Sequence, residues 1–179
     1  MLDVVEAVFL REGIRGMRIG EIAAEAACSR STLYELAPSK EDLLLLVLDR
    51  VLRRILRHGA EAIERATDPV ERVRALMMTG ALEFAALGPQ FLEDVGQHAP
   101  SRRLFERRLG EGRDALAALI GAAVDEGVFR PVDAAVVAEA IIAVVMWFAY
   151  PQFARAGRPA STTDLAQLVD VYIEGLRPR

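Results

Sequence analysis

Apolar residues recur along almost the whole chain at the spacing of one helix face, three or four residues apart. No stretch alternates apolar and polar residues between turn signals, as a half-buried strand would. Glycine, proline, serine and aspartate separate the periodic segments, where they end one helix or cap the next. The pattern predicts an all-α protein. Its nine predicted helices span residues 3–12, 19–26, 30–36, 39–66, 70–87, 89–95, 100–126, 133–150 and 161–176.

The last two predicted helices differ from the others in their apolar content. Residues 141–148 are apolar on all faces of the helix, which indicates burial on more than one side. A helix near the end of a chain of this size is not easily enclosed by its own fold, so we expect a homodimer built as an intermolecular four-helix bundle. The expected interface residues are Val137, Ile141, Val144, Val145, Leu165, Leu168, Val169 and Tyr172.

The amino-acid composition agrees with an all-α homodimer. Hydrophobic residues make up 53% of the chain, at the upper end for a monomer, which also favours contact with another chain.

Cys28 is the only cysteine, so no internal disulfide can form and a reducing cytoplasm fits best. The longest apolar run, residues 140–151, is shorter than the roughly 18 to 20 residues of a membrane span. The acidic N-terminus is unlike a secretory signal, so we expect a cytoplasmic protein.

Two short predicted helices near the N-terminus carry the functional signal. Residues 19–26 and 30–36 are joined by a three-residue break, and the small side chains of Ala23 and Ala26 allow the two helices to approach closely. This is the helix-turn-helix arrangement, in which the N-terminal part of the second helix enters the DNA major groove. Leu33 would face inward. The exposed donors suited to bases and phosphates are Arg30, Ser31, Thr32 and Tyr34.

Residues 1–50 resemble the DNA-binding domain of the TetR family of bacterial regulators. The resemblance implies a nine-helix fold, with a helix-turn-helix domain over residues 1–48 and a ligand-binding and dimerisation domain over residues 49–179. It also implies a transcriptional regulator, by default a repressor, that binds double-stranded DNA as a homodimer and is released by a small-molecule effector. The residues that carry it are Phe9, Gly13, Ile22, Ala23, Ser29, Thr32, Leu33, Tyr34, Ser39, Lys40 and Leu43.

Several positions depart from the family pattern. Ala27 stands where glycine commonly makes the turn, so the backbone there is either left-handed, at a cost of roughly 1 kcal/mol, or differently shaped. Arg18 replaces a hydroxyl residue that usually caps the second helix, and its charge could supply the phosphate contact instead. Met1 falls where the first helix of the family begins, so either the start lies upstream or the contacts of a basic arm are missing.

The charge of residues 1–50 also limits how they can bind DNA. This region contains six basic and nine acidic residues, so its net charge is negative. DNA binding must therefore depend on a few positioned contacts and not on a generally positive surface. Carried over by position, the expected DNA-binding residues are Arg18, Ser29, Arg30, Ser31, Thr32, Tyr34 and Lys40.

The remainder of the chain supplies large apolar side chains that suit an apolar or aromatic effector. For any one of them, an ordinary core position is the better interpretation, and only the family resemblance favours a pocket for the group. The expected ligand-binding residues are Met77, Met78, Phe84, Phe91, Phe105, Met146, Trp147 and Phe148.

The alternatives to a DNA-binding regulator are an enzyme and a ligand-binding protein that does not bind DNA tightly. An enzyme is not expected, because the sequence has no nucleophile with a base at a recognisable spacing and no glycine-rich phosphate loop. His58 and His98 lack acids or thiols at ligand spacing, so we expect no metal site and no cofactor. The stronger alternative is a dimeric ligand-binding helical protein whose DNA binding is weakened or lost, which the acidic N-terminal region favours.

Overall fold

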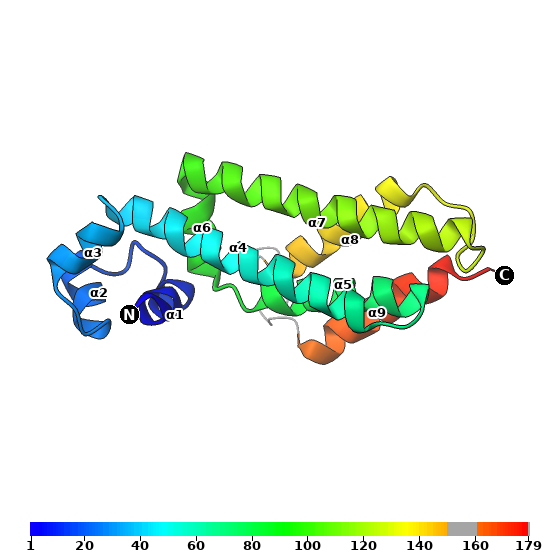
Figure 1. Cartoon of the computed structure of the whole chain (residues 1–179), viewed down its shortest axis with the longest axis horizontal. Helices are drawn as coiled ribbons and strands as arrows, with labels where there is room; N and C mark the ends of the chain where they lie inside the picture. Colours follow the sequence, from blue (N-terminus) through cyan, green and yellow to red (C-terminus); the bar gives the residue numbers. More distant parts are fainter. Residues whose placement is uncertain (150–160, 179) are drawn as a thin grey trace. The chain divides into compact units, whose positions relative to one another are not determined.

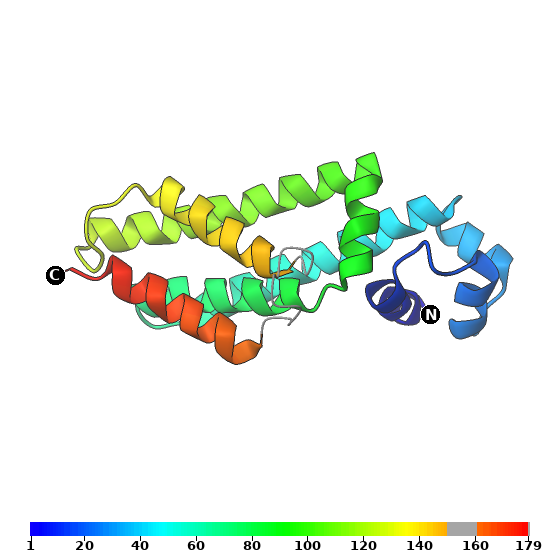
Figure 2. The same ribbon diagram turned by 180° about the vertical axis from the view of Figure 1, so that it is seen from behind.

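The computed structural model describes residues 1–149 and 161–178, except for the side chains of residues 148 and 149. All regular structure in these residues is helical, which confirms the predicted all-α class (Figures 1 and 2). The helices are α1 (Leu2–Glu12), α2 (Ile19–Glu25), α3 (Arg30–Leu36), α4 (Lys40–Arg65), α5 (Pro69–Ala85), α6 (Pro89–Gln97), α7 (Ala99–Asp125), α8 (Ala134–Ala149) and α9 (Thr162–Leu176).

Serine and aspartate side chains begin several of these helices. The Ser39 hydroxyl accepts a hydrogen bond from the Asp42 amide at 3.0 Å, and the Asp68 carboxylate accepts one from the Glu71 amide at 2.9 Å. Such caps satisfy amide groups that have no partner inside the helix, which is why the predicted helix starts lie close to the observed ones. At its C-terminal end, α6 continues beyond the predicted residue 95, because the amide of His98 still donates to the carbonyl of Asp94.

The chain divides into two compact units, which are described separately here. The head unit consists of Met1–Arg53 and Ala86–Arg108, and therefore holds α1 to α3, α6 and parts of α4 and α7. The body unit consists of the described residues of Arg54–Ala85 and Leu109–Arg179. The division joins α6 to the N-terminal helices, across a gap of more than thirty residues in the sequence. The functional boundary at residue 48 remains a prediction.

The core of the head unit lies between α1, α4 and α6. Phe9 of α1 and Phe91 of α6 are fully buried, and α1 packs along α6. The helix-turn-helix pair is attached through its apolar side, with Ile22 of α2 and Leu33 of α3 buried. These buried residues recur at helical spacing, so each helix turns one face to the core and leaves the other exposed.

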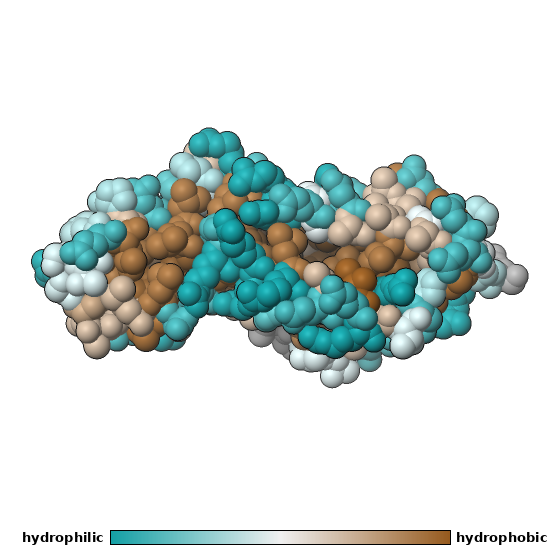
Figure 3. All heavy atoms as spheres, viewed as in Figure 1, coloured by the Kyte–Doolittle hydropathy of each residue, from teal (hydrophilic) through white to brown (hydrophobic). Residues whose placement is uncertain are grey.

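The core of the body unit is built around α5, which packs against α8 and α9. Met77 of α5, Ile141 of α8 and Val169 of α9 are buried there. No single helix in the described residues is long and apolar enough to span a membrane. Among the described helix pairs, only α5 with α6 has the combined length and apolar composition of a span. In the space-filling view of Figure 3, apolar residues reach the surface over α1 of the head unit; Val4 of this helix and Met1, which precedes it, are exposed.

Candidate nucleic-acid interface

The turn between α2 and α3 adopts the left-handed conformation that the sequence left open. Ala27 has a φ of 50°, and the amide of Cys28 donates to the carbonyl of Ala23 at 3.0 Å. An alanine held in this region costs roughly 1 kcal/mol, because its Cβ approaches the backbone more closely than in glycine. The two helices are therefore joined by the expected tight turn despite the missing glycine.

The hydroxyl groups at the start of α3 form a local cluster. Ser29 accepts a hydrogen bond from the Thr32 amide at 3.0 Å and thereby caps the helix. The Ser29 hydroxyl also shares hydrogen bonds with the hydroxyls of Ser31, at 2.6 Å, and Thr32, at 2.9 Å. These bonds fix the first turn of α3 and hold the three hydroxyls in one place.

The side chains of α3 divide sharply between buried and exposed. Leu33 is 1% exposed and Tyr34 is 49% exposed, as the helical spacing predicted. Arg30 is exposed, and its guanidinium lies across the start of α2, where a Cβ on Gly20 would come within 2.5 Å of it. The exposed side of α3 thus presents an aromatic ring with a hydroxyl group and a guanidinium, which are groups that bind bases and phosphates.

Three of the six basic residues in the first fifty positions are already paired with acids. Arg11 pairs with Glu25 at 3.1 Å, Arg15 with Asp94 at 3.2 Å, and Arg50 with Glu6 at 2.8 Å. The pKa of Arg11 is raised above its ordinary value, first by its hydrogen bond to Glu12 and then by the one to Glu25. These pairs cancel part of the local charge and leave fewer cations for a phosphate backbone.

Two arginines next to the helix-turn-helix are exceptions. Arg18, which precedes α2, and Arg30, at the start of α3, are exposed and form no ion pair within the part of the chain that the structure describes. Their positive charge is available to a polyanion, and both residues were predicted to bind DNA. The remaining acidic excess agrees with the expectation that a few positioned contacts carry the binding.

Lys40, which was predicted to bind DNA, also has partners inside the head unit. Its ammonium donates to the carbonyls of Ile14, at 2.6 Å, and Met17, at 3.1 Å, in the loop between α1 and α2. An ammonium has three donors, so one remains for another partner. The phosphate contact of Lys40 stays a prediction.

The residues expected to bind an effector do not gather in one unit. Phe91 and Phe105 are buried in the head unit, whereas Met77 and Phe84 are buried in the body unit. The remaining members are half-buried or exposed residues of the body unit, apart from Phe148, whose side chain lies outside the described residues. They are Met78, Met146 and Trp147.

Half of the residues expected at the dimer interface are interior residues of this chain. Four have 7% exposure or less, because their own unit already covers them, and they are Ile141, Val145, Leu165 and Val169. The half-buried ones are Val137, Val144, Leu168 and Tyr172. Apolar residues that do reach the surface are Val136, at 64% exposure, and Val171, at 70%.

For two polar residues, sequence reasoning missed the partner that the structure shows. Asp94 of α6 has a fully buried carboxylate that accepts a hydrogen bond from the Ile14 amide at 2.6 Å. His58 of α4 is not a simple surface residue, because its Nδ1 lies 2.6 Å from the carboxylate of Glu83 on α5. No local sequence signal connects either residue with its partner. Among the described residues, no group of histidine, cysteine or acidic side chains could hold a metal ion.

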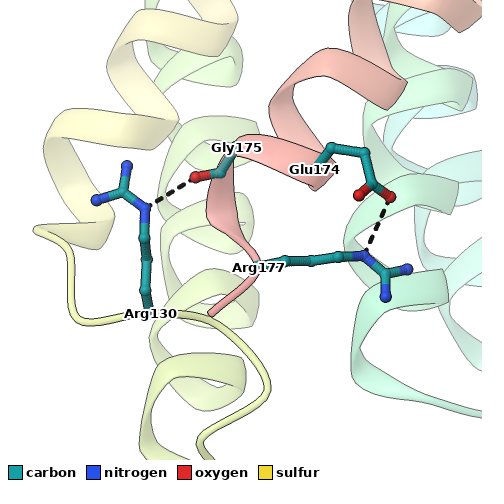
Figure 4. Close-up of a pocket in the computed structure, with 4 residues that line it drawn as sticks. All are labelled: Arg130, Glu174, Gly175 and Arg177. Carbon is teal, nitrogen blue, oxygen red and sulfur yellow. Dashed lines mark hydrogen bonds and ion pairs between the residues drawn. The ribbon is translucent and has the colours of Figure 1, made fainter. Parts of the chain in front are cut away.

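A cavity of about 640 Å³ lies at the end of α9, where two arginines and a glutamate meet (Figure 4). The Nε of Arg130 donates to the carbonyl of Gly175 at 2.8 Å, and Arg177 pairs with Glu174 at 3.1 Å. The Arg130 amide also donates to the carbonyl of Leu176. Arg130 therefore caps the last turn of α9, where a cation is favoured by the helix dipole.

Comparison with known proteins agrees with the geometry of the head. Residues 1–47 match the family model for bacterial regulatory proteins of the tetR family. The chain is 25% identical over 136 residues to the HTH-type transcriptional repressor KstR2 of Mycobacterium tuberculosis, an alignment that covers 73% of this chain and 68% of the repressor.

Solved structures share the fold over nearly the whole chain. A transcriptional regulator from Saccharomonospora viridis in complex with choline has a TM-score of 0.86 at 23% identity, covering 99% of this chain and 96% of that one. AibR in complex with isovaleryl coenzyme A and operator DNA has a TM-score of 0.70 at 25% identity, with coverage of 99% and 96%. Taken with the helix-turn-helix and the exposed side of α3, these matches identify residues 1–47 as a DNA-binding domain of the TetR family, and they support a TetR-family transcriptional regulator.

Proposed function

We propose that this regulator binds a palindromic operator as a homodimer, through α3 of each protomer, and that a small apolar or aromatic effector releases it. The observation that carries the proposal is the pair of exposed arginines, Arg18 and Arg30, whose guanidinium groups form no ion pair among the described residues, beside the exposed ring of Tyr34. A guanidinium at the start of a recognition helix can form two hydrogen bonds to a guanine edge. Repression is the mode that the likeness to KstR2 supports.

The test of this interface is a comparison of Arg30→Ala with Arg72→Ala, which removes an exposed arginine from α5 of the body unit. An operator is first selected from a random duplex library with the unmodified protein. Arg30→Ala should relax the preference at one base of each half-site by about 1–3 kcal/mol. Arg72→Ala should bind as the unmodified protein does. Equal base preference in all three proteins would contradict the proposed role of Arg30.

The surface of α8 supports the homodimer. Val136, Ala140 and Ala143 are exposed and lie at the spacing of one helix face, and Val171 of α9 is also exposed. Two-fold symmetry brings the same surface of two protomers together, and small side chains allow the helices to approach closely. Such a dimer would place its two copies of α3 about 34–36 Å apart, which is one turn of DNA.

The dimer is tested by Ala140→Glu, with Ala118→Glu on the exposed side of α7 as the matched control. A glutamate on the α8 surface would be buried twice across the two-fold axis without a partner, so the variant should be monomeric by light scattering and bind the operator at least about tenfold more weakly. The control should remain dimeric. A dimeric Ala140→Glu variant with normal affinity would place the interface elsewhere.

The proposed effector site lies in the body unit, where Met77 and Phe84 are buried. The structural relatives described above include one that holds choline and one that holds isovaleryl coenzyme A, so the fold accommodates small ligands of different chemistry. A library of small aromatic and branched acyl compounds can be tested for release of fluorescent operator DNA. We expect release with the dimer intact, because a ligand that favours a different spacing of the heads shifts the population. Release accompanied by dissociation into monomers would contradict this mechanism.

A further inference from the structure

Ile14 lies in the loop between α1 and α2, and both its backbone amide and its backbone carbonyl form hydrogen bonds with charged side chains. Its amide donates to the Asp94 carboxylate of α6 at 2.6 Å, and its carbonyl accepts from the Lys40 ammonium of α4 at 2.6 Å. Asp94 lies 80 residues away in the sequence and Lys40 lies 26 residues away. One residue of the loop is therefore tied to two other helices of the head unit.

The Asp94 carboxylate is a charged group that is buried away from water. Its side chain is fully buried, and one oxygen lies 3.2 Å from the Nε of Arg15 without a hydrogen bond among the described residues. Removing a carboxylate from water costs several kcal/mol unless charges and hydrogen bonds compensate. Arg15 and the Ile14 amide supply that compensation, so the carboxylate ties α6 to this one loop.

Two glycines allow α6 to approach the end of α1 closely enough for this bond. Gly13 has a φ of 69°, and a Cβ there would lie 2.5 Å from the carboxylate of Asp94. A Cβ on Gly88 would lie 2.1 Å from the carbonyl oxygen of Leu10. A side chain at Gly88 would require a backbone shift, and one at Gly13 would displace side chains of α6 at a left-handed φ, so both positions are adapted to the contact.

We propose that Asp94 and Lys40 are positioning residues for DNA binding, which fix the loop from Gly13 to Met17 and thereby the placement of α2 and α3. The proposal rests on the proposed function, since it assigns the two residues to the DNA-binding head. The family model covers residues 1–47 of this chain, and the proposal adds α6 to the part of the chain that DNA binding requires. Binding sites lose much of their affinity when their groups move by about 1 Å, so an untied loop weakens binding even in a folded protein.

The first test compares Asp94→Asn with Glu93→Gln in the full-length protein. Asparagine keeps the size and an acceptor oxygen but removes the charge that faces Arg15, whereas Glu93 is an exposed neighbour on the same helix, 3.7 Å from Arg15. Asp94→Asn should weaken binding to the selected operator by about tenfold. It should leave the dimer and the dependence of affinity on salt concentration unchanged, because no phosphate contact is lost. Unchanged affinity in Asp94→Asn would overturn the proposal.

A second measurement reads the position of the loop without DNA. Amide hydrogen exchange of Ile14 and of α2 and α3 should be faster in Asp94→Asn than in Glu93→Gln, at a temperature where both are folded. If the unmodified protein failed to bind any selected DNA, the proposed function would fail, and the exchange rates would still decide the positioning role. Equal exchange in the two variants would overturn it.

Lys40 provides an independent variant should Asp94→Asn not fold. Lys40→Gln should also weaken binding without changing its dependence on salt concentration, and Lys40→Arg should restore it in part, because arginine can donate to both carbonyls. The double variant Asp94→Asn with Lys40→Gln should lose less than the product of the two separate losses, since both residues hold the same loop. Fully multiplicative losses would show that the two residues act separately and would overturn the shared role.

Discussion

The loop before the helix-turn-helix in the head unit and the core of the body unit are stabilised by different kinds of contact. In the head, the charged groups of Asp94 and Lys40 bind the backbone of a loop that leads into the helix-turn-helix. In the body, α5 packs on α8 and α9 through apolar side chains, and the ion pairs between helices, such as Arg113 with Glu139, lie at the exposed edges. Hydrogen bonds fix direction, whereas apolar burial depends mainly on area. The charged contacts therefore fix the orientation of the loop in the head unit, whereas the packing of α5, α8 and α9 depends mainly on buried apolar area.

The largest expected effect concerns Phe91, which sequence reasoning assigned to an effector pocket. Its side chain is fully buried in the head unit, so Phe91→Ala should lower the free energy of unfolding by about 3–5 kcal/mol. Leu82→Ala, at a 40% exposed position of α5, should change it by about 0.5 kcal/mol or less. Denaturant unfolding of both variants measures the difference. A cost for Phe91→Ala near that of Leu82→Ala would show that Phe91 lines an open pocket.

Alanine in place of glycine should have opposite effects in the two units. Gly88→Ala places a Cβ against the carbonyl of Leu10 and should destabilise the head by about 3 kcal/mol. Gly80→Ala, inside α5 where a Cβ meets nothing within 4 Å, should stabilise the protein by about 0.5–1 kcal/mol. Thermal unfolding of the two variants gives the signs directly. Stabilisation by both substitutions would mean that α6 and α1 are not in close contact.

The smallest expected effect concerns an ion pair of the body unit. The pKa of Arg74 is raised, chiefly by its hydrogen bond to Asp170. A raised arginine pKa adds stability that is complete below its ordinary value and is lost only at higher pH, so this group adds no pH dependence between about pH 6 and 9. Arg74→Ala should cost about 1 kcal/mol or less, because the pair is partly exposed. A cost of several kcal/mol, or one that varies across this pH range, would contradict this account.

Sequence reasoning succeeded where the signals are local. The bounds of α3 were predicted as Arg30–Leu36, because Ser29 caps its start and Pro38 follows its end. The inward direction of Leu33 and the outward direction of Tyr34 followed from helical spacing alone. The DNA-binding roles of the residues around α3 remain predictions that this placement supports.

Contacts between distant residues could not be predicted in the same way. Asp94 is one of two adjacent acids on a short helix, and nothing near it in the sequence indicates a bond to Ile14. Apolarity likewise shows that a residue is buried but not which chain buries it. Ile141 and Leu165 were therefore assigned to a partner although they lie in the chain's own core, while the exposed Val136 was overlooked.

The central claim is that the head binds duplex DNA through a few cations in defined positions. It is tested most directly by the affinity of the unmodified protein for its selected operator at increasing salt concentration. Each neutralised phosphate contributes about −0.9 to the slope of log affinity against log salt, so contacts from two heads predict a slope of roughly −4 or steeper. A slope near zero would contradict the claim and favour a ligand-binding dimer that has lost its DNA binding.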